Sequence, residues 1–96
     1  MGIDWDIAKA ASNLWKHKVS FEIAATVFAD PLAMSVLDED HGLYEERWLT
    51  IGLAQDQKML VVSHTFTEDE NGRALIRIIS ARRATANERR QYEFGK

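Results

Sequence analysis

The opening third of the chain repeats its apolar positions with the period of a helix. Within residues 7–17, Ile7, Ala11, Leu14 and Trp15 recur at helical spacing. An aspartate just ahead of this run can accept the free N–H groups of the first turn. We therefore predict an amphipathic helix over residues 7–17 with these four apolar side chains facing the core.

A second helix is predicted over residues 21–29. Ser20 can act as its N-cap. The helix should end at Asp30, because the following Pro31 disfavours helical geometry in the residue before it. Its expected buried stripe consists of Phe21, Ala24, Ala25 and Phe28.

After Pro31 the period of the apolar positions shortens from that of a helix to that of a strand. Strands are predicted at residues 33–37, 47–53, 58–66 and 73–81. Because short turns join these strands in succession, we expect an antiparallel four-stranded meander. Residues 3–5 can form one further short strand at the start of the chain.

The chain closes with a third predicted helix. Residues 85–88, Thr-Ala-Asn-Glu, match the capping-box pattern, so this helix should begin near Ala86 and run to about Phe94. The predicted fold class is therefore α+β, with two N-terminal helices and a C-terminal helix packed on one face of a mainly antiparallel four-stranded sheet.

Composition supports one soluble domain over residues 1–96, since 46% of the residues are hydrophobic and 28% are charged. There are no cysteines, so disulfides and thiolate metal sites are excluded. The N-terminal residues lack the pattern of an export signal, and no apolar run approaches the length of a membrane span. We expect a cytoplasmic protein.

The charge of the chain is divided unevenly. Residues 73–96 contain seven Lys or Arg and two Asp or Glu, whereas residues 1–72 contain five and thirteen, and the whole chain has a net charge of −3. One cationic end beside an acidic remainder suggests a site for a polyanion next to a surface for a basic partner.

A series of short motifs, from Trp5 to Glu93, resembles the family of BrnT-like toxins through its joint order and spacing. The motifs are Trp5-Asp6-Ile7-Ala8-Lys9 with Asn13, Lys16-His17-Lys18-Val19-Ser20-Phe21-Glu22, Phe28-Ala29-Asp30-Pro31, Glu46-Arg47, Ile76-Arg77-Ile78-Ile79-Ser80-Ala81-Arg82, Ala84 and Glu88-Arg89-Arg90-Gln91-Tyr92. The family usually has glycine where Lys18 stands here, at a helix end where a left-handed lysine costs roughly 1 kcal/mol.

The resemblance implies a RelE-like fold and a ribonuclease that inhibits translation. It also implies a neutralising BrnA-like antitoxin from the same operon, whose DNA-binding part lets the complex repress its own promoter. Operator DNA would then be contacted only through the antitoxin. A homodimer and a toxin–antitoxin heterotetramer are both compatible with this interpretation.

Cutting an RNA chain by attack of its own 2′-hydroxyl needs a base, an acid and cations that hold the phosphorane. Arg82 is predicted to be the leading phosphate clamp, because a guanidinium grips phosphate oxygens at two points. Arg47 and Arg77 should support it from neighbouring strands. The alternative is that these arginines are solvated or pair with carboxylates such as Glu45 and Glu46.

The candidate acids and bases are His17, His64 and Glu46. A histidine titrates near neutrality, yet His64 lies among apolar positions, where a histidine is more often a hydrogen-bonded core group than a catalyst. His17 can instead cap its helix, and His41 is expected to be solvated. RelE-like enzymes often work without a histidine. The three histidines lack the spacing of metal ligands, so neither a metal nor another cofactor is predicted.

Further RNA contacts are predicted for Lys16, Arg83, Arg89, Arg90 and Tyr92, with Tyr92 stacking on a base. The alternative for the last helix is a solvated face, with Tyr92 packed on the sheet. The acidic residues 38–40, together with Glu45 and Glu46, are expected to be a solvated loop, or else a patch for the antitoxin.

These observations lead to one interpretation and two rivals. The interpretation is a metal-independent endoribonuclease toxin of a type II toxin–antitoxin pair. One rival is a non-catalytic binding or regulatory module that keeps the toxin fold. The other is a metal-dependent nuclease, which a chelator would inhibit.

Overall fold

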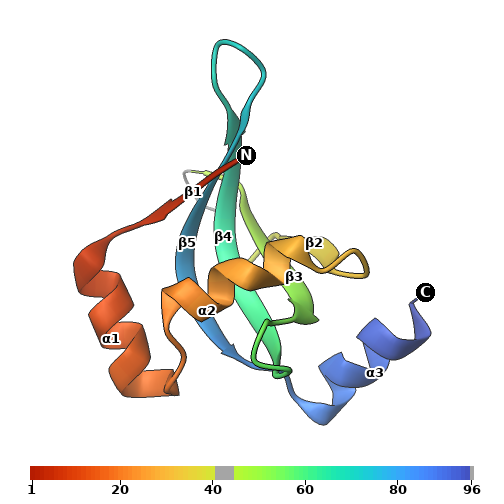
Figure 1. The fold of residues 1–96 in the computed structure, drawn as a ribbon. Helices are drawn as coiled ribbons and strands as arrows, with labels where there is room; N and C mark the ends of the chain where they lie inside the picture. Colours follow the sequence, from red (N-terminus) through yellow and green to blue (C-terminus); the bar gives the residue numbers. More distant parts are fainter. Residues whose placement is uncertain (41–44, 96) are drawn as a thin grey trace.

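The computed structural model describes residues 1–40 and 45–95 (Figure 1). The expectation for His41 lies outside these residues. In the described part of the chain, no helix combines the length and apolar character that crossing a membrane requires.

A single mixed sheet forms the centre of the molecule. Its five strands are β1 (Gly2–Trp5), β2 (Met34–Asp38), β3 (Arg47–Leu53), β4 (Met59–Glu68) and β5 (Ala74–Arg83). Their order across the sheet is β1-β5-β4-β3-β2, and all neighbours are antiparallel except β1 and β5, which are parallel.

The prediction of a four-stranded antiparallel sheet was therefore incomplete. The meander of β2 to β5 is present, but residues 2–5 add a fifth, parallel strand that pairs with residues 75–78 of β5. This pairing brings Ile3 and Trp5 against the core. A local pattern of alternation cannot reveal such a contact, because the two strands are about seventy residues apart in sequence.

The three α-helices begin directly after the residues that were predicted to cap them. Helix α1 (Ile7–His17) starts after Asp6, whose carboxylate accepts the Lys9 N–H at 3.0 Å. Helix α2 (Phe21–Ala25) starts after Ser20, whose hydroxyl accepts the Ile23 N–H. Helix α3 (Ala86–Phe94) carries the predicted capping box of Thr85 and Glu88.

The second helix is shorter than predicted, because the chain tightens into a 3₁₀ helix, η1 (Thr26–Ala29), after Ala25. The Thr26 hydroxyl donates to the Ile23 carbonyl at 2.6 Å and accepts the Gln55 N–H at 2.8 Å. A side chain bonded both to its own helix and to the β3–β4 turn favours this local change.

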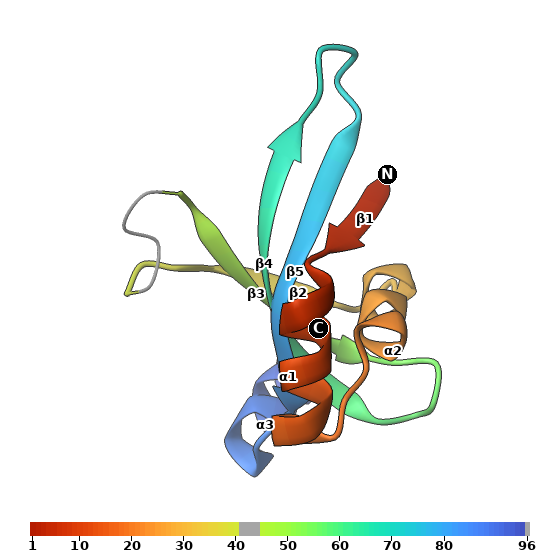
Figure 2. The ribbon, with the colours of Figure 1, turned by 90° about the vertical axis from the view of Figure 1, so that its left-hand side faces the viewer.

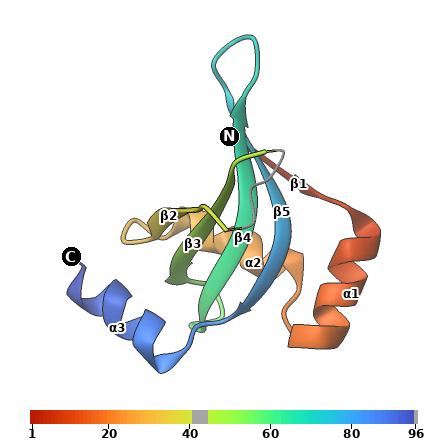
Figure 3. The ribbon, with the colours of Figure 1, turned by 180° about the vertical axis from the view of Figure 1, so that it is seen from behind.

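The helices do not all cover one face of the sheet, and this expectation was wrong. In Figure 1, α2 runs in front of the sheet, and in Figure 3, seen from behind, the strands lie in front of α2. Helix α3 packs Tyr92 on the opposite face, against Ile51, Met59 and Val61. Both sides of β4 are apolar near its start, so each face can bury a helix. The main core lies on the α2 face and contains Phe21, Ala24, Val27, Leu60, Val62 and Ile78.

Helix α1 lies against the edge of β5 rather than over a face of the sheet. The side chain of Asn13 is buried, accepts the Ala81 N–H at 3.0 Å, and donates to the carbonyls of Ala81 and Val19 at 2.9 Å. The amide thus takes the place of a neighbouring strand beyond the point where β1 ends.

This docking overturns the expectation for the apolar stripe of α1. Ile7, Leu14 and Trp15 were predicted to face the core, but they are 83%, 50% and 80% exposed. Asn13 is buried against β5, and Ala10 packs against the core from the same side. The buried hydrogen bonds of Asn13 decide which side of the helix turns inward, and Figure 2 shows α1 standing at the edge of the sheet.

Candidate active site on the open face of the sheet

A groove lies on the face of the sheet that carries α3, next to the part of this face that the helix covers. It has a volume of about 420 Å³ and is lined by Asp38, Asp40, Arg47, Leu49, Ser63, Ile79, Ser80 and Arg82. Two of the three arginines predicted to hold phosphate, Arg47 and Arg82, therefore meet in one place, although they are thirty-five residues apart in the chain.

The strand register explains why these residues meet. One row of paired residues crosses β3, β4 and β5 and consists of Leu49, Ser63 and Ser80. The neighbouring row on one side of it contains Arg47. On its other side lies the row of Ile51, Val61 and Arg82. The strand pairing slips by one residue between Ser63 and His64, so that Ile79 is an extra residue of β5 and reaches the groove together with Ser80.

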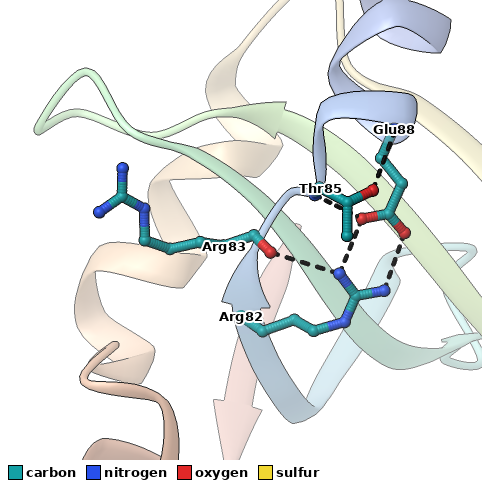
Figure 4. Close-up of polar contacts among 4 residues, drawn as sticks. All are labelled: Arg82, Arg83, Thr85 and Glu88. Atoms are coloured by element: carbon teal, nitrogen blue, oxygen red, sulfur yellow. Dashed lines mark hydrogen bonds and ion pairs between the residues drawn. The ribbon is translucent and has the colours of Figure 1, made fainter.

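Arg82 is held in place by Glu88 of α3 (Figure 4). Its Nη1 and Nη2 atoms donate to the two carboxylate oxygens of Glu88 at 2.7 and 2.8 Å. Nη1 also donates to the carbonyl of Arg83 at 3.3 Å. The hydrogen bonds from Arg82 lower the pKa of Glu88 to about 2, and the same contact raises the pKa of Arg82.

This pairing leaves half of the guanidinium available. No further described residue accepts a hydrogen bond from Arg82, so its Nε–H and the second Nη2–H remain, and these two donors lie on the same edge of the planar group. Such an edge matches two oxygens of a phosphate. Glu88 therefore orients the guanidinium without occupying the edge that an anion needs.

Arg47 offers a second donor to the same groove. Its Nε atom is buried and has no hydrogen-bond partner among the described residues. A buried N–H without a partner is unfavourable by about 1–3 kcal/mol and calls for an explanation. This atom is shielded from the groove, so Arg47 contributes the charge of its guanidinium to the groove rather than a hydrogen bond from Nε.

A second hollow continues the groove on the other side of β5. It is lined by Lys9, Ser12, Asn13, Lys16, His17, Ile79 and Ser80, so it shares Ile79 and Ser80 with the groove. A strip of cationic side chains therefore runs from Arg47 and Arg82 over β5 to Lys9 and Lys16 on α1. Lys16 was among the predicted RNA-binding residues.

The remaining predicted arginines lie elsewhere. Arg77 is exposed and forms an ion pair with Asp4 at 3.2 Å on the same face of the sheet, outside the residues that line the groove. Arg83 points away from Arg82 in Figure 4 and lines a hollow on the other face together with His17 and Lys58. Alternation along β5 therefore separates two arginines that are adjacent in sequence.

His64 is a buried core group on the opposite face from the groove. Its Nδ1 lies 3.1 Å from the Thr65 carbonyl, which can only accept, so Nδ1 carries the proton. Nε2 then accepts from the Thr50 hydroxyl at 2.6 Å, and Thr50 accepts from Ser35. Burial lowers the pKa of His64, so the ring stays neutral near pH 7.

The other candidates have varied surroundings. Tyr92 is buried and donates to Asp30 at 2.8 Å, so its ring is used in packing; burial, followed by the contact with Asp30, raises its pKa. Arg90 bonds Asn87, Arg89 is exposed, and neither lines the groove. Glu46 is exposed and also lies outside the residues that line it. The described residues contain no group of three acidic or histidine side chains arranged to hold a metal ion.

Sequence reasoning missed several members of the groove. Asp38 and Asp40 were expected only as a solvated loop or an antitoxin patch, yet both line the groove. Glu88 was recognised as a helix cap but not as the partner of Arg82. Ser80 could have been found from its spacing, since it stands two residues before Arg82 and so shares its strand face.

Comparisons with known proteins identify the family and the fold. The model of the family described as "Ribonuclease toxin, BrnT, of type II toxin–antitoxin system" matches residues 5–88. The crystal structure of the Brucella abortus ribonuclease toxin BrnT matches with a TM-score of 0.66 and 22% identity, over 88% of this chain and 97% of that chain. At this identity the likeness shows the fold. A search of curated proteins found no significant match.

Proposed function

Because the chain belongs to the family of BrnT ribonuclease toxins of type II toxin–antitoxin systems, we propose that it cleaves RNA in the groove between Arg47 and Arg82. The activity is proposed to reside in a single domain of residues 1–96, to need no metal ion, and to act in the cytoplasm. The supporting observation is the free edge of the Arg82 guanidinium, which Glu88 orients toward a groove that Arg47 shares.

In this proposal the scissile phosphate binds between the two arginines. Arg82 donates from Nε and Nη2, and the Arg47 side chain lines the same groove, so the non-bridging oxygens face guanidinium groups on both sides. Such donors stabilise the phosphorane more than the substrate, since negative charge increases on these oxygens in the transition state. The RNA strand continues over Ser80 to Lys9 and Lys16.

We propose Asp40 as the general base. Its exposed carboxylate lines the groove and has no hydrogen-bond partner among the described residues. The carboxylate takes the proton of the 2′-hydroxyl, the 2′-oxygen bonds to phosphorus, and the bond from phosphorus to the 5′-oxygen breaks. The products are a 2′,3′-cyclic phosphate and a 5′-hydroxyl that takes its proton from water. His17 is the alternative base, from the far side of β5.

The test is cleavage of an end-labelled RNA by the purified protein. Arg82→Ala and Arg47→Ala should each lower the cleavage rate at least about a hundredfold, the usual effect of removing one donor to a developing anion. Asp40→Asn should do the same while His17→Ala retains activity. Arg83→Ala is the matched control, because it removes a neighbouring arginine that faces away from the groove. Undiminished cleavage by both Arg82→Ala and Arg47→Ala would exclude this groove as the site.

A second experiment tests the cellular role. Induced expression should arrest growth and degrade RNA, and co-expression of an antitoxin from the same operon should restore growth. We propose that this antitoxin binds the toxin in a heterotetramer and contacts operator DNA itself. Normal growth with intact RNA, from a folded protein, would favour a non-catalytic binding module. Inhibition of cleavage by EDTA would favour a metal-dependent nuclease.

A further inference from the structure

Helix α1 presents an apolar stripe to solvent. Ile7, Ala11, Leu14 and Trp15 lie along one side of the helix, and Ile7 and Trp15 are 83% and 80% exposed. The helix buries Asn13 against β5, and Lys9 and Lys16 line the hollow beside Ser80. A contiguous exposed apolar surface with polar neighbours is typical of a protein-binding site.

We propose that this stripe binds the same stripe of a second copy of the chain, with the two α1 helices antiparallel about a two-fold axis at Ala11. A two-fold interface must be complementary to itself, so that residue i contacts residue j and j contacts i. Ile7 and Trp15 each lie four residues from Ala11. Antiparallel pairing therefore places Ile7 of each copy against Trp15 of the other, with the small Ala11 at the centre.

The charges at the two ends of the stripe favour the same arrangement. Glu22 and Ile7 line one hollow between α1 and α2, and Asp6 caps the helix there. At the other end, the Lys18 ammonium lies 4.8 Å from the centre of the Trp15 ring. Antiparallel pairing brings Lys18 of one copy to the acidic end of the other. It also places the opposite ends of the two helix dipoles side by side.

The length of α1 and the position of the stripe indicate a weak dimer whose grooves remain open. Two helices of eleven residues with a small residue at the crossing can approach to about 8–10 Å. They bury an area at the small end of protein interfaces, for which we expect weak, concentration-dependent association. The basic residues Lys9 and Lys16 lie on another side of α1, so both grooves of the dimer stay open.

Sedimentation of the purified chain from about 1 to 500 µM measures this association. Trp15→Ala and Ile7→Ser should each raise the dimer dissociation constant at least about tenfold, since a buried aromatic anchor carries much of the energy of a small interface. Both side chains are exposed, so the fold should persist, which circular dichroism checks. Phe94→Ser is the matched control: Phe94 is also 80% exposed, but it lies on α3, and its loss should leave the constant unchanged.

Charge reversal tests the antiparallel orientation. Glu22→Lys and Lys18→Glu should each weaken the dimer, and the double variant should regain affinity. A chain that stays monomeric at 500 µM would overturn the proposal, as would a dimer that Trp15→Ala leaves intact. Protection of Trp15 by the antitoxin in a monomeric toxin would assign the stripe to that partner instead. A double variant that dimerises more weakly than either single variant would exclude the antiparallel pairing.

Discussion

Lys18 occupies a backbone conformation that favours glycine. Its φ and ψ angles are 60° and 29°, in the left-handed region, and its N–H closes α1 by donating to the Leu14 carbonyl at 3.0 Å. The turn that glycine makes cheaply is thus retained by a lysine, whose Cβ is crowded there.

Lys18→Gly should raise the free energy of unfolding by about 1 kcal/mol, because glycine removes this crowding. For a domain of this size that corresponds to a rise in Tm of about 4–8 °C. Thermal and urea unfolding measure both quantities. Lys16→Gly, inside the helix, is the control and should lower stability by about 1 kcal/mol. If Lys18→Gly also lowers stability, the left-handed cap does not persist in solution.

Glu88 serves two partners at once. It accepts the Thr85 N–H in the capping box and pairs with both terminal nitrogens of Arg82. Its pKa of about 2, mainly due to Arg82, lies below the usual value for glutamate. The folded state therefore binds this proton less readily than the unfolded state, and the pair stabilises the fold above the unfolded pKa.

The stabilisation by this pair should be complete above about pH 5 and be lost as the pH falls from about 4.5 to 2. We expect the pair to contribute about 1–2 kcal/mol to the free energy of unfolding, after allowing for screening by solvent. Urea unfolding of the wild type and of Glu88→Gln at pH 7, 4 and 3 measures it, because glutamine keeps the cap but removes the charge. An equal decline with acid in both proteins would show that Glu88 does not contribute it.

At the scale of elements, one amide side chain joins α1 to the sheet. Asn13 bonds both backbone groups of Ala81 and the Val19 carbonyl after α1. Ala81 immediately precedes Arg82, and Asn13 and Lys16 line the hollow that shares Ser80 with the groove. The position of α1, and with it the cationic strip, therefore depends on these three hydrogen bonds.

Asn13→Ala should lower the free energy of unfolding by about 3 kcal/mol or more, since it leaves three buried backbone groups without partners at about 1–3 kcal/mol each. Chemical denaturation measures the loss. Ser12→Ala, an exposed neighbour on the same helix, should be nearly neutral. A loss below 1 kcal/mol in Asn13→Ala would mean that water replaces the amide and that α1 is held mainly by apolar contacts.

At the scale of the whole molecule, one surface has a local charge that is opposite in sign to the net charge of the chain. The chain is acidic, with a net charge of −3, yet Arg47, Arg82, Lys9 and Lys16 form one strip across the open face and the edge of the sheet. Local potential rather than net charge governs attraction of a polyanion. The acidic surface elsewhere favours a basic partner.

Lys9→Gln with Lys16→Gln should weaken RNA binding and reduce its dependence on salt. Each phosphate contact on a single strand contributes about 0.7 to the slope of log K against log salt, so the loss of two contacts should lower the slope by about 1.4. Titration of a labelled RNA at several salt concentrations measures the slope. Lys58→Gln with Arg73→Gln changes charge equally away from the strip and should leave it unchanged. Equal effects of the two pairs would mean that RNA does not follow the strip.

Short-range interactions explain what could be predicted from the sequence. The bounds of α1, β3 and α3 were correct because caps and periodicity act over three or four residues, and each is complete within its own segment. Arg47 and Arg82 were recognisable as candidate phosphate-binding residues from their chemistry and from the motifs around them. The α+β class followed from the change of period after Pro31.

Only the tertiary structure decided how these segments meet, because contacts between distant residues leave no local pattern. The pairing of β1 with β5, the docking of α1 through Asn13, and the extra residue Ile79 depend on contacts across the whole chain. The docking of α1 exposes Ile7 and Trp15, and the packing of α3 on the sheet buries Tyr92. Thus the sequence by itself determined most of the elements and the family resemblance, and the tertiary structure decided which of the candidate residues line the groove.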